Sequence, residues 1–385
     1  MTDDEARRGS LWALATPALV LDRKKLKRNL EAMSERATRH DLDLRPHLKT
    51  AKSVEIGRLA TAEHSGGITV STLREAAYFI DGGFRDITYA VGLAPDKIDT
   101  VAGLQGDDVW VNVLVDNVPA ARMLAKRADT LGVAFRAFIE IDTGDHRAGL
   151  TPDAEDLVAV AQALDESERV DVRGVLSHAG HSYRAQGADA IAAVAEEERH
   201  GLVVAAQRLR DAGFACPAVS PGSTPTAVYG KSWAGCTEMR PGNYMFFDLF
   251  QAGLGTCGID DIAVSVVATV IGHKRDYNRL YVDAGALALS KDASANDTMA
   301  GAGYGLVCDM AGQPVAGVRV TNVSQEHGWV ATANGGDPLP FERFPIGSRL
   351  RILPNHSCLT AAAYDRYYVV EGHALVDEWP RINGW

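Results

Sequence analysis

Short apolar runs alternate with amphipathic segments over roughly the first 250 residues of the chain. After Asp22, apolar residues recur at helical spacing at Leu26, Leu30, Met33 and Ala37, so the pattern predicts a helix that Asp22 can cap. The same criteria predict strands over 68–71, 87–91, 109–115, 135–142, 172–178 and 217–220, and helices over 72–80, 117–131, 153–164 and 188–212. Strands that alternate with helices are typical of right-handed βα units in a parallel sheet.

Eight or nine such units lie between about residue 20 and residue 250, which fits a closed (β/α)8 barrel of about 250 residues. An open doubly wound sheet is the alternative. From Ile262 onward the segments alternate and are β-branched, which predicts a mainly antiparallel β domain with strands over 264–271, 279–283, 317–323 and 349–353. We therefore predict a barrel over residues 16–255 and a β-rich domain formed by 256–385 together with 1–15.

Composition narrows the class of protein. The chain has 385 residues, of which 46% are hydrophobic and 23% charged, so it can bury the core of an enzyme-sized globular protein. The formal net charge of -11 argues against a nucleic-acid-binding protein, because such proteins carry a basic surface patch.

The compartment follows from apolar runs and cysteines. No apolar run approaches the roughly 20 residues that span a membrane. Arg7 and Arg8 precede a moderately apolar stretch, as in an export signal, but Pro17 interrupts that stretch. Five widely spaced cysteines without a CxxC pair argue against a disulfide framework. We therefore predict a cytoplasmic protein without membrane partners.

A basic segment, RPHLKTAK at residues 45–52, follows the first predicted helix. A lysine becomes a covalent catalyst when burial or a neighbouring cation lowers its pKa, and Arg45, His47 and Lys52 can supply that positive charge to Lys49. The alternative is a solvated basic strand end, since charge clusters usually face water.

Two glycine-bearing segments follow the last predicted barrel strands, VSPGSTPT at 219–226 and EMRPGNYMFFD at 238–248. Glycine lets the backbone approach a ligand closely, and amides and hydroxyls can bind phosphate oxygens. Barrel phosphate sites commonly lie in the loops after strands 7 and 8, so these segments are candidates for a phosphate site. Ordinary tight turns are the alternative.

Two further polar segments end predicted strands, EIDTGDHR at 140–147 and SHAGHSY at 177–183. A barrel presents its catalytic side chains at such strand ends, which makes Arg147 a candidate. An exposed loop cluster is the alternative reading. His178 can stack on or hydrogen-bond a ligand, but it can equally be a core histidine whose bonds are satisfied.

A different chemical signal lies in the predicted β domain, in PNHSCLT at 354–360. In an extended segment, residues two apart face the same side, so His356 and Cys358 can reach one metal ion. Imidazole and thiolate suit zinc, and two protein ligands leave positions for water and substrate. Chance occurrence of this short pattern is the alternative.

The order of these segments, beginning with TPALVLD at 16–22 and RPHLKT at 45–50, resembles the fold-type III enzymes that use pyridoxal 5'-phosphate (PLP). The similarity is to the branch that contains D-serine dehydratase, D-threo-3-hydroxyaspartate dehydratase and D-threonine aldolase. It implies an alanine-racemase-like (β/α)8 barrel with a second, mainly antiparallel β domain, and a homodimer. It also implies that Lys49 carries PLP as a Schiff base.

The resemblance assigns further roles in the cofactor site. Arg147 is expected to hold the phenolate oxygen of PLP, Tyr183 matches an active-site tyrosine of the dehydratase branch, and His178 is expected beside the cofactor. The residues expected to contact the phosphate are Ser223, Thr224, Gly242, Asn243 and Tyr244, with Gly222 as the enabling turn.

His356 and Cys358 match the metal pair of the two dehydratases, whereas D-threonine aldolases carry an aspartate where Cys358 stands. The expected ion is Zn²⁺, or another divalent cation such as Mn²⁺ or Co²⁺, and QEHG at 325–328 is expected near it. His181 and Arg184 suit an acidic substrate such as 3-hydroxyaspartate, or they are surface residues.

The implied activity is that of a PLP- and metal-dependent lyase, which converts D-serine, D-threonine or D-threo-3-hydroxyaspartate into a 2-oxo acid and ammonia. Retro-aldol cleavage to an amino acid such as glycine and an aldehyde is the first alternative. A racemase is a weaker alternative among enzymes, because racemases of this fold need no HxC metal pair. A PLP-carrying regulatory protein is the alternative from another class, although such proteins lack the second domain.

Overall fold

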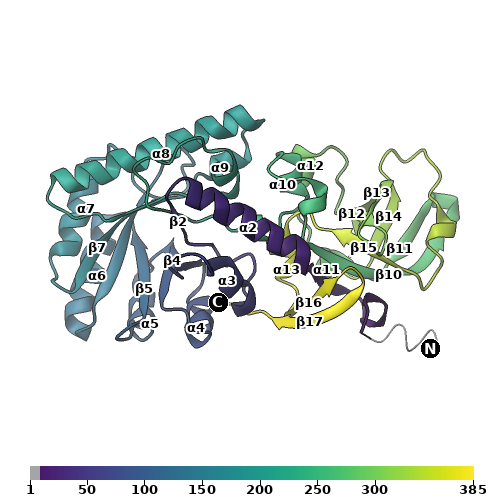
Figure 1. The fold of residues 1–385 in the computed structure, drawn as a ribbon, viewed down its shortest axis with the longest axis horizontal. Helices are drawn as coiled ribbons and strands as arrows, with labels where there is room; N and C mark the ends of the chain where they lie inside the picture. The colour runs from purple at the N-terminus through teal and green to yellow at the C-terminus, as the bar shows by residue number, and fades with distance from the viewer. Residues whose placement is uncertain (1–8) are drawn as a thin grey trace. The chain divides into compact units, whose positions relative to one another are not determined.

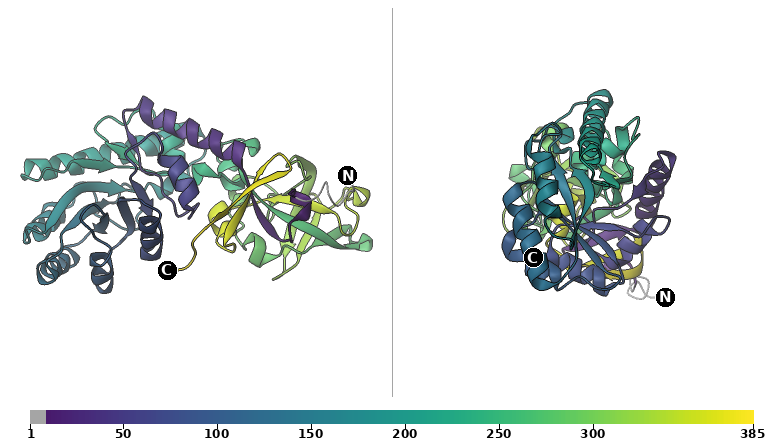
Figure 2. Two further views of the ribbon diagram at one scale, coloured as in Figure 1. Left: turned by 60° about the horizontal axis from the view of Figure 1, so that its bottom comes forward. Right: turned by 90° about the vertical axis from the view of Figure 1, so that its left-hand side faces the viewer.

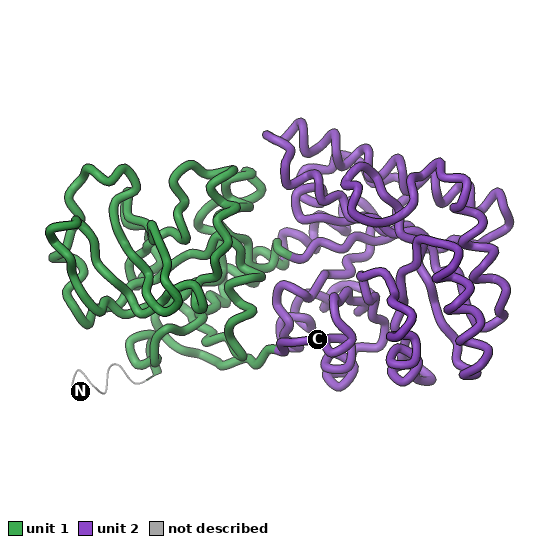
Figure 3. The backbone as a smooth tube through the Cα atoms, turned by 180° about the vertical axis from the view of Figure 1, so that it is seen from behind, with its two compact units in different colours: residues 1–30, 243–381 green, residues 31–242, 382–385 purple. Residues whose placement is uncertain are grey.

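The computed structural model describes residues 9–385, which form two compact units (Figure 3). Parallel strands lie in one unit and mainly antiparallel strands in the other. Unit 1 comprises the chain up to Leu30 together with Asn243–Arg381. Unit 2 comprises Glu31–Gly242 together with Ile382–Trp385. Each unit has its own sheet and its own buried apolar residues.

Unit 2 contains a set of parallel strands. Six of them form one sheet in the order β3-β4-β5-β6-β7-β8. Their bounds are β3 Ile68–Val70, β4 Asp86–Gly92, β5 Trp110–Val115, β6 Phe135–Ile141, β7 Val170–Ser177 and β8 Ala218–Ser220. Two short strands, β2 (Asp43–Leu44) and β9 (Glu238–Met239), pair with each other.

Hydrogen bonds join this short pair to both edges of the larger sheet. On one side, the Leu48 N–H donates to the Thr69 carbonyl over 2.8 Å and the Thr69 N–H donates to the Pro46 carbonyl over 3.0 Å. On the other side, the Thr237 N–H donates to the Val219 carbonyl over 2.9 Å. These parallel strands therefore close on themselves, which confirms the predicted (β/α)8 barrel and excludes the open doubly wound sheet.

Helices lie outside the parallel strands (Figures 1 and 2). They are α3 Val54–Thr61, α4 Leu73–Asp81, α5 Ile98–Ala102, α6 Val118–Leu131, α7 Asp156–Asp165, α8 Ala188–Asp211 and α9 Thr224–Tyr229, and α2 (Arg23–Arg39) precedes them. Strands covered in this way are apolar on both faces, and Val111, Val113, Ile139 and Val175 are fully buried. The resulting density of apolar residues explains why the predicted strands lie within a few residues of the observed ones.

Unit 1 contains a mainly antiparallel sheet in the order β11-β14-β13-β12-β15-β10-β1-β16-β17, and β11 also pairs with β10. The strands are β1 Ala18–Asp22, β10 Val264–Lys274, β11 Arg279–Val282, β12 Leu306–Cys308, β13 Pro314–Val323, β14 Gly328–Thr332, β15 Arg349–Leu353, β16 Arg366–Glu371 and β17 Ala374–Pro380. Its short helices are α10 Leu249–Gly253, α11 Ala286–Leu289, α12 Ala295–Thr298 and α13 Ser357–Ala361. The predicted antiparallel β domain is thus confirmed.

The division between the units differs from the predicted domain boundaries. β1 was expected in the barrel, but it pairs with β10, where Leu19 faces Val266, and with β16. The segment after Gly242 also packs in unit 1, where the Thr298 hydroxyl donates to the Phe250 carbonyl over 3.3 Å. Pairing between distant segments sets these boundaries, and local patterning does not reveal it.

Two expectations about location can be compared with the fold. Among residues 9–385, no helix is both long and apolar enough to cross a membrane. The Arg7-Arg8 pair lies outside the described residues. The five cysteines form no disulfide.

Candidate active site and metal centre

Lys49 lies in the loop between β2 and α3, and its side chain is exposed. The cations expected to lower its pKa are engaged elsewhere: the Lys52 ammonium pairs with the buried Glu75 over 3.0 Å, and Arg45 pairs with Asp86 over 2.6 Å. His47 stays neutral, because burial and then Lys49 hold the pKa of its imidazole well below the ordinary value. Of the three residues expected to supply positive charge to Lys49, two are therefore paired with carboxylates and the third is neutral.

The neighbours of Lys49 are two neutral imidazoles and a buried guanidinium. Burial, and then the Lys49 ammonium, lower the pKa of His178 to about 3, with smaller contributions from Arg147 and Arg240. The His178 Nδ1 lies 2.9 Å from the Gly222 carbonyl and donates to it, which leaves Nε2 as an acceptor. The positive groups around this point are thus Lys49, Arg147 and Arg240.

Acidification should destabilise the cofactor-free protein through His178. Its pKa is about 3 in the fold, against 6.5 ordinarily, so the unfolded chain binds more protons between these values. The free energy of unfolding therefore falls as the pH falls through this window. His178→Asn keeps a donor for the Gly222 carbonyl but cannot be protonated. Urea unfolding should show that the free energy of unfolding falls less between about pH 7 and about pH 4.5 for the variant than for the unmodified protein. An equal fall in both proteins would contradict the assignment.

Gly222 permits the close approach of two loops. Its φ is +150°, and a Cβ atom there would lie 2.5 Å from the Arg240 backbone nitrogen. Gly242 is equally constrained, because a Cβ atom would lie 2.7 Å from the His47 carbonyl oxygen. The Ser223 side chain accepts from the Thr226 N–H and forms a capping box at the start of α9. The glycines at both predicted phosphate turns are therefore required by packing.

Glu198, in the middle of α8, holds the loops after β7 and β8 together. Its buried carboxylate accepts from the Ser177 hydroxyl over 2.9 Å and from the Ala179 N–H over 3.2 Å. The same carboxylate accepts from the Gly222 N–H over 3.0 Å and from the Thr226 hydroxyl over 2.9 Å. His178 and Gly222 are thereby fixed relative to one another.

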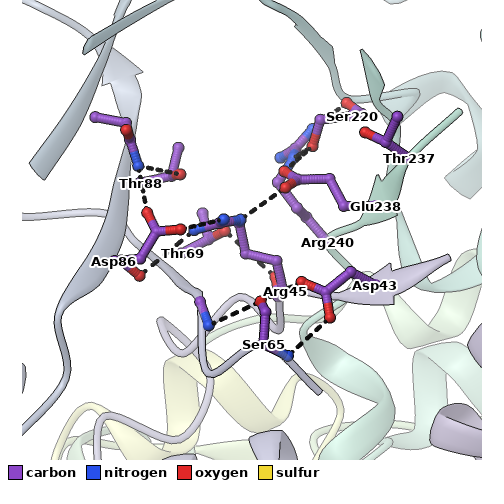
Figure 4. Close-up of polar contacts among 12 residues, drawn as sticks. Asp43, Arg45, Ser65, Thr69, Asp86, Thr88, Ser220, Thr237, Glu238 and Arg240 are labelled. Atoms are coloured by element: carbon purple, nitrogen blue, oxygen red, sulfur yellow. Dashed lines mark hydrogen bonds and ion pairs between the residues drawn. The ribbon is translucent and has the colours of Figure 1, made fainter. Parts of the chain in front are cut away.

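Arg240 is buried at the end of β9, and burial lowers the pKa of its guanidinium to about 10. It donates to the Ser220 hydroxyl over 2.7 Å and to the carbonyl of Ser177. Ser220 in turn donates to Glu238 over 2.6 Å, and Glu238 accepts from Arg45 over 2.9 Å (Figure 4). A continuous buried network therefore positions Arg240.

Arg147 and Tyr183 lie on the loops after β6 and β7. Arg147 is half-exposed, and its guanidinium lies 3.7 Å from the Glu140 carboxylate. The Tyr183 ring lies 6.2 Å from the His178 ring, centroid to centroid. Of the two residues considered for an acidic substrate, Arg184 pairs with Asp145 over 3.3 Å, and His181 is mostly buried.

In unit 1, the HxC segment forms a turn into α13 and not the extended segment that we predicted. His356 is the N-cap residue and Cys358 lies in the first turn, close enough for their side chains to hydrogen-bond. The His356 Nδ1 lies 2.9 Å from the Asp292 carboxylate. Within residues 9–385, no set of three His, Cys, Asp or Glu side chains has metal-binding geometry. The segment offers two protein ligands.

The remaining predicted residues also belong to unit 1. The Asn243 side-chain amide donates to Asp248 over 2.7 Å, and Tyr244 is fully buried. The turn at 325–328 packs on Gly285, whose Cβ atom would lie 2.5 Å from the Gln325 carbonyl oxygen. The predicted cofactor residues are thus divided between the two units, and their contacts with PLP remain predictions.

Sequence reasoning missed four functional candidates: Arg240, Asp248, Glu198 and Asp292. Arg240 and Asp248 lie inside a segment that was singled out, but no role was given to them. Glu198 carries a usable signal, because it occupies the apolar stripe of α8 where a charge is unexpected. Asp292 carries no local signal, since only the fold brings it to His356.

Comparisons with known proteins bear on both units. Residues 21–249 match the family model "Alanine racemase, N-terminal domain", and residues 263–370 match "Putative serine dehydratase domain". The chain is 42% identical to D-threo-3-hydroxyaspartate dehydratase of Delftia sp. (strain HT23), over 98% of this chain and 99% of that one. It is 34% identical to D-serine dehydratase of Dictyostelium discoideum, over 97% and 98% of the two chains. It is 27% identical to D-threonine aldolase of Arthrobacter sp, over 94% and 91%.

Solved structures agree with these relatives. D-threo-3-hydroxyaspartate dehydratase from Delftia sp. HT23 superposes with a TM-score of 0.94 at 42% identity, covering 98% of this chain and 100% of that one. A cysteine-to-alanine variant of that enzyme in the metal-free form gives a TM-score of 0.95 at 42% identity, with the same coverage. An alanine racemase from Clostridium difficile 630, at 14% identity and a TM-score of 0.68 over 94% and 98% of the chains, shares the fold. The chain belongs to the fold-type III family of PLP enzymes, with an alanine-racemase-type barrel and a serine-dehydratase-type second domain.

Proposed function

We propose that this protein is a PLP- and divalent-metal-dependent lyase that dehydrates D-3-hydroxy amino acids to a 2-oxo acid and ammonia. D-serine, D-threonine and D-threo-3-hydroxyaspartate are the candidate substrates. The observation that carries the proposal is the pairing of His356 with Cys358 and Asp292, in a chain 42% identical to a hydroxyaspartate dehydratase.

The barrel residues fit an anionic cofactor. Lys49, Arg147 and Arg240 bring positive charge to one place beside His178, whose pKa is lowered first by burial and then by these cations. Gly222 lets the backbone come close, beside the Ser223 and Thr224 hydroxyls. PLP bound there supplies an electron sink for a carbanion at Cα. We assign phosphate contacts to Ser223, Thr224, Gly242, Asn243 and Tyr244.

Lys49 has two tasks in this proposal. Its amine would hold the cofactor, and as a free amine it would act as the base that takes the α-proton of the substrate from the face that it occupies. Because Lys49 takes the α-proton from one face only, it selects substrates of the D configuration. Arg147 holds the phenolate oxygen, and Tyr183 lies beside His178 at the same end of the barrel.

The metal ligands in this proposal are His356 and Cys358. The Asp292 carboxylate engages His356 Nδ1, which orients the ring and leaves Nε2 for a metal ion, as metal-binding histidines require. A divalent cation supplies Lewis acidity toward a hydroxyl leaving group. Two of the similar solved structures carry a histidine-to-alanine and a cysteine-to-alanine substitution two positions apart, the spacing of His356 and Cys358. Zn²⁺ is the proposed ion.

Metal removal tests this proposal. Chelation should abolish ammonia release from D-threo-3-hydroxyaspartate while leaving the visible absorbance of bound PLP intact, because cofactor and metal have separate ligands. Cys358→Ala should do the same and lower the zinc content. Cys216→Ala is the matched control, because this buried cysteine lies beside Arg210 in the barrel unit, away from the proposed ligands. Full turnover by the chelated, zinc-free protein would rule out a metal-dependent reaction.

Two further properties belong to the proposal. We propose a homodimer, because the resemblance to the family implies one. We propose a cytoplasmic location, which the five cysteines without a disulfide support.

A further inference from the structure

One buried carboxylate in unit 1 contacts both a predicted phosphate residue and the predicted metal segment. Asp248 is 1% exposed and lies between β9 and α10. Its Oδ2 accepts from the Asn243 side-chain amide over 2.7 Å and from the Ser357 N–H over 3.0 Å. Ser357 stands between His356 and Cys358, so the carboxylate reaches the centre of the HxC segment.

Capping of α10 uses only one of the two carboxylate oxygens of Asp248. Asp248 is the N-cap residue of α10, and its Oδ1 accepts from the Gln251 N–H over 3.0 Å. The other oxygen plays no part in the cap. It accepts from Asn243 and from both the N–H and the hydroxyl of Ser357, the latter over 3.3 Å.

Backbone bonds reinforce the same connection. The Leu249 N–H donates to the Pro354 carbonyl over 3.0 Å, and the Phe250 N–H donates to the Asn355 carbonyl over 3.2 Å. The start of α10 is therefore attached to the residues that lead into His356. A shift of either segment must be accompanied by a shift of the other or by the loss of these bonds.

We propose that Asp248 is a positioning residue that couples PLP binding to metal binding. The inference rests on the proposed function, in which Asn243 contacts the PLP phosphate and His356 and Cys358 bind the metal. Ordering of Asn243 by the phosphate would fix Asp248, and Asp248 would fix Ser357 between the two metal ligands. The Asn243 amide also donates to the Ser357 hydroxyl over 3.3 Å, which is longer than its 2.7 Å bond to Asp248. Each ligand should then raise the affinity for the other by the same factor, because coupling free energies are reciprocal.

The test measures four affinities of the full-length protein. The apparent Kd for Zn²⁺, from competition with a chromophoric chelator, is determined with and without PLP. The apparent Kd for PLP, from its visible absorbance, is determined with and without Zn²⁺. In the unmodified protein, we expect each ligand to lower the apparent Kd of the other by about tenfold.

Asp248→Asn should reduce this factor to about one. Asparagine still caps α10 through its side-chain oxygen, but it turns an NH₂ group toward the donors of Asn243 and Ser357. Asp22→Asn is the matched control, because Asp22 caps α2 in the same unit by accepting from the N–H groups of Lys24 and Lys25 over 3.0 Å each. The control should keep the tenfold coupling.

Asn243→Ala provides a second test if Asp248→Asn folds poorly. It leaves the bonds between Asp248 and Ser357 in place and removes both bonds that Asn243 makes, to Asp248 and, over 3.3 Å, to the Ser357 hydroxyl. The coupling should therefore be lost, while Asp248 still holds Ser357 when Zn²⁺ binds without PLP. Coupling that survives in either variant, or its absence from the unmodified protein, overturns the inference. Failure of the unmodified protein to bind PLP or Zn²⁺ at all would instead overturn the proposed function, and the inference with it.

Discussion

Lys49→Ala will abolish covalent attachment of PLP and lower the rate of ammonia release by about 10³-fold or more, since it removes both the attachment point and the base. Borohydride reduction followed by peptide mapping measures the first effect. The unmodified protein should retain the cofactor on the peptide that contains Lys49, and the variant should retain none.

Lys52→Gln is the matched control for Lys49→Ala. The Lys52 ammonium pairs with the buried Glu75 over 3.0 Å, and glutamine can still donate to that carboxylate. This control should keep the reducible adduct and most of the activity. An adduct that persists in Lys49→Ala and disappears in Lys52→Gln would show that the assignment of the cofactor lysine is wrong.

Glu238→Ala should lower the free energy of unfolding by about 3 to 5 kcal/mol, as expected when one partner of a buried ion pair is removed. Glu238 is 5% exposed and accepts from the Arg45 guanidinium and the Ser220 hydroxyl. Its loss leaves Arg45 with Asp86 alone and frees Ser220 to move away from Arg240 (Figure 4). Urea unfolding curves provide the measurement.

Glu371→Ala is the control for this effect. Glu371 pairs with Arg23 over 2.7 Å, but the two side chains are 35% and 42% exposed. Water and salt therefore screen the pair. Glu371→Ala should lower the free energy of unfolding by about 1 kcal/mol or less. Similar losses for the two variants would mean that the buried network does not stabilise the barrel.

The barrel could be predicted because its strands are buried on both faces. Segments 135–142 and 172–178 contain adjacent buried apolar residues, such as Phe138 with Ile139 and Val175 with Leu176, and their bounds in the fold differ by only a few residues. The same feature caused the error at 16–22, because an apolar run fits a buried strand in either unit. Only the pairing of β1 with β10 and β16 decides between them.

Prediction of the site was limited by contacts between distant residues. The sequence pattern placed the candidate residues at strand ends. It could not indicate that Arg45 pairs with Asp86 and Glu238, which are distant in the sequence. The argument from an extended segment for His356 and Cys358 was wrong about the backbone, because the chain turns into α13 there. Asp292 reaches His356 only through the fold.

The products formed from D-threo-3-hydroxyaspartate test the central claim most directly. The protein loaded with PLP and Zn²⁺ is incubated with this substrate, and 2-oxo acid, ammonia, glycine and aldehyde are measured in the same sample. We predict that the 2-oxo acid and ammonia appear in equal amounts, with D-serine and D-threonine as comparison substrates. Glycine and an aldehyde in equal amounts would identify an aldolase, and the absence of all four products with every substrate would contradict an enzymatic role.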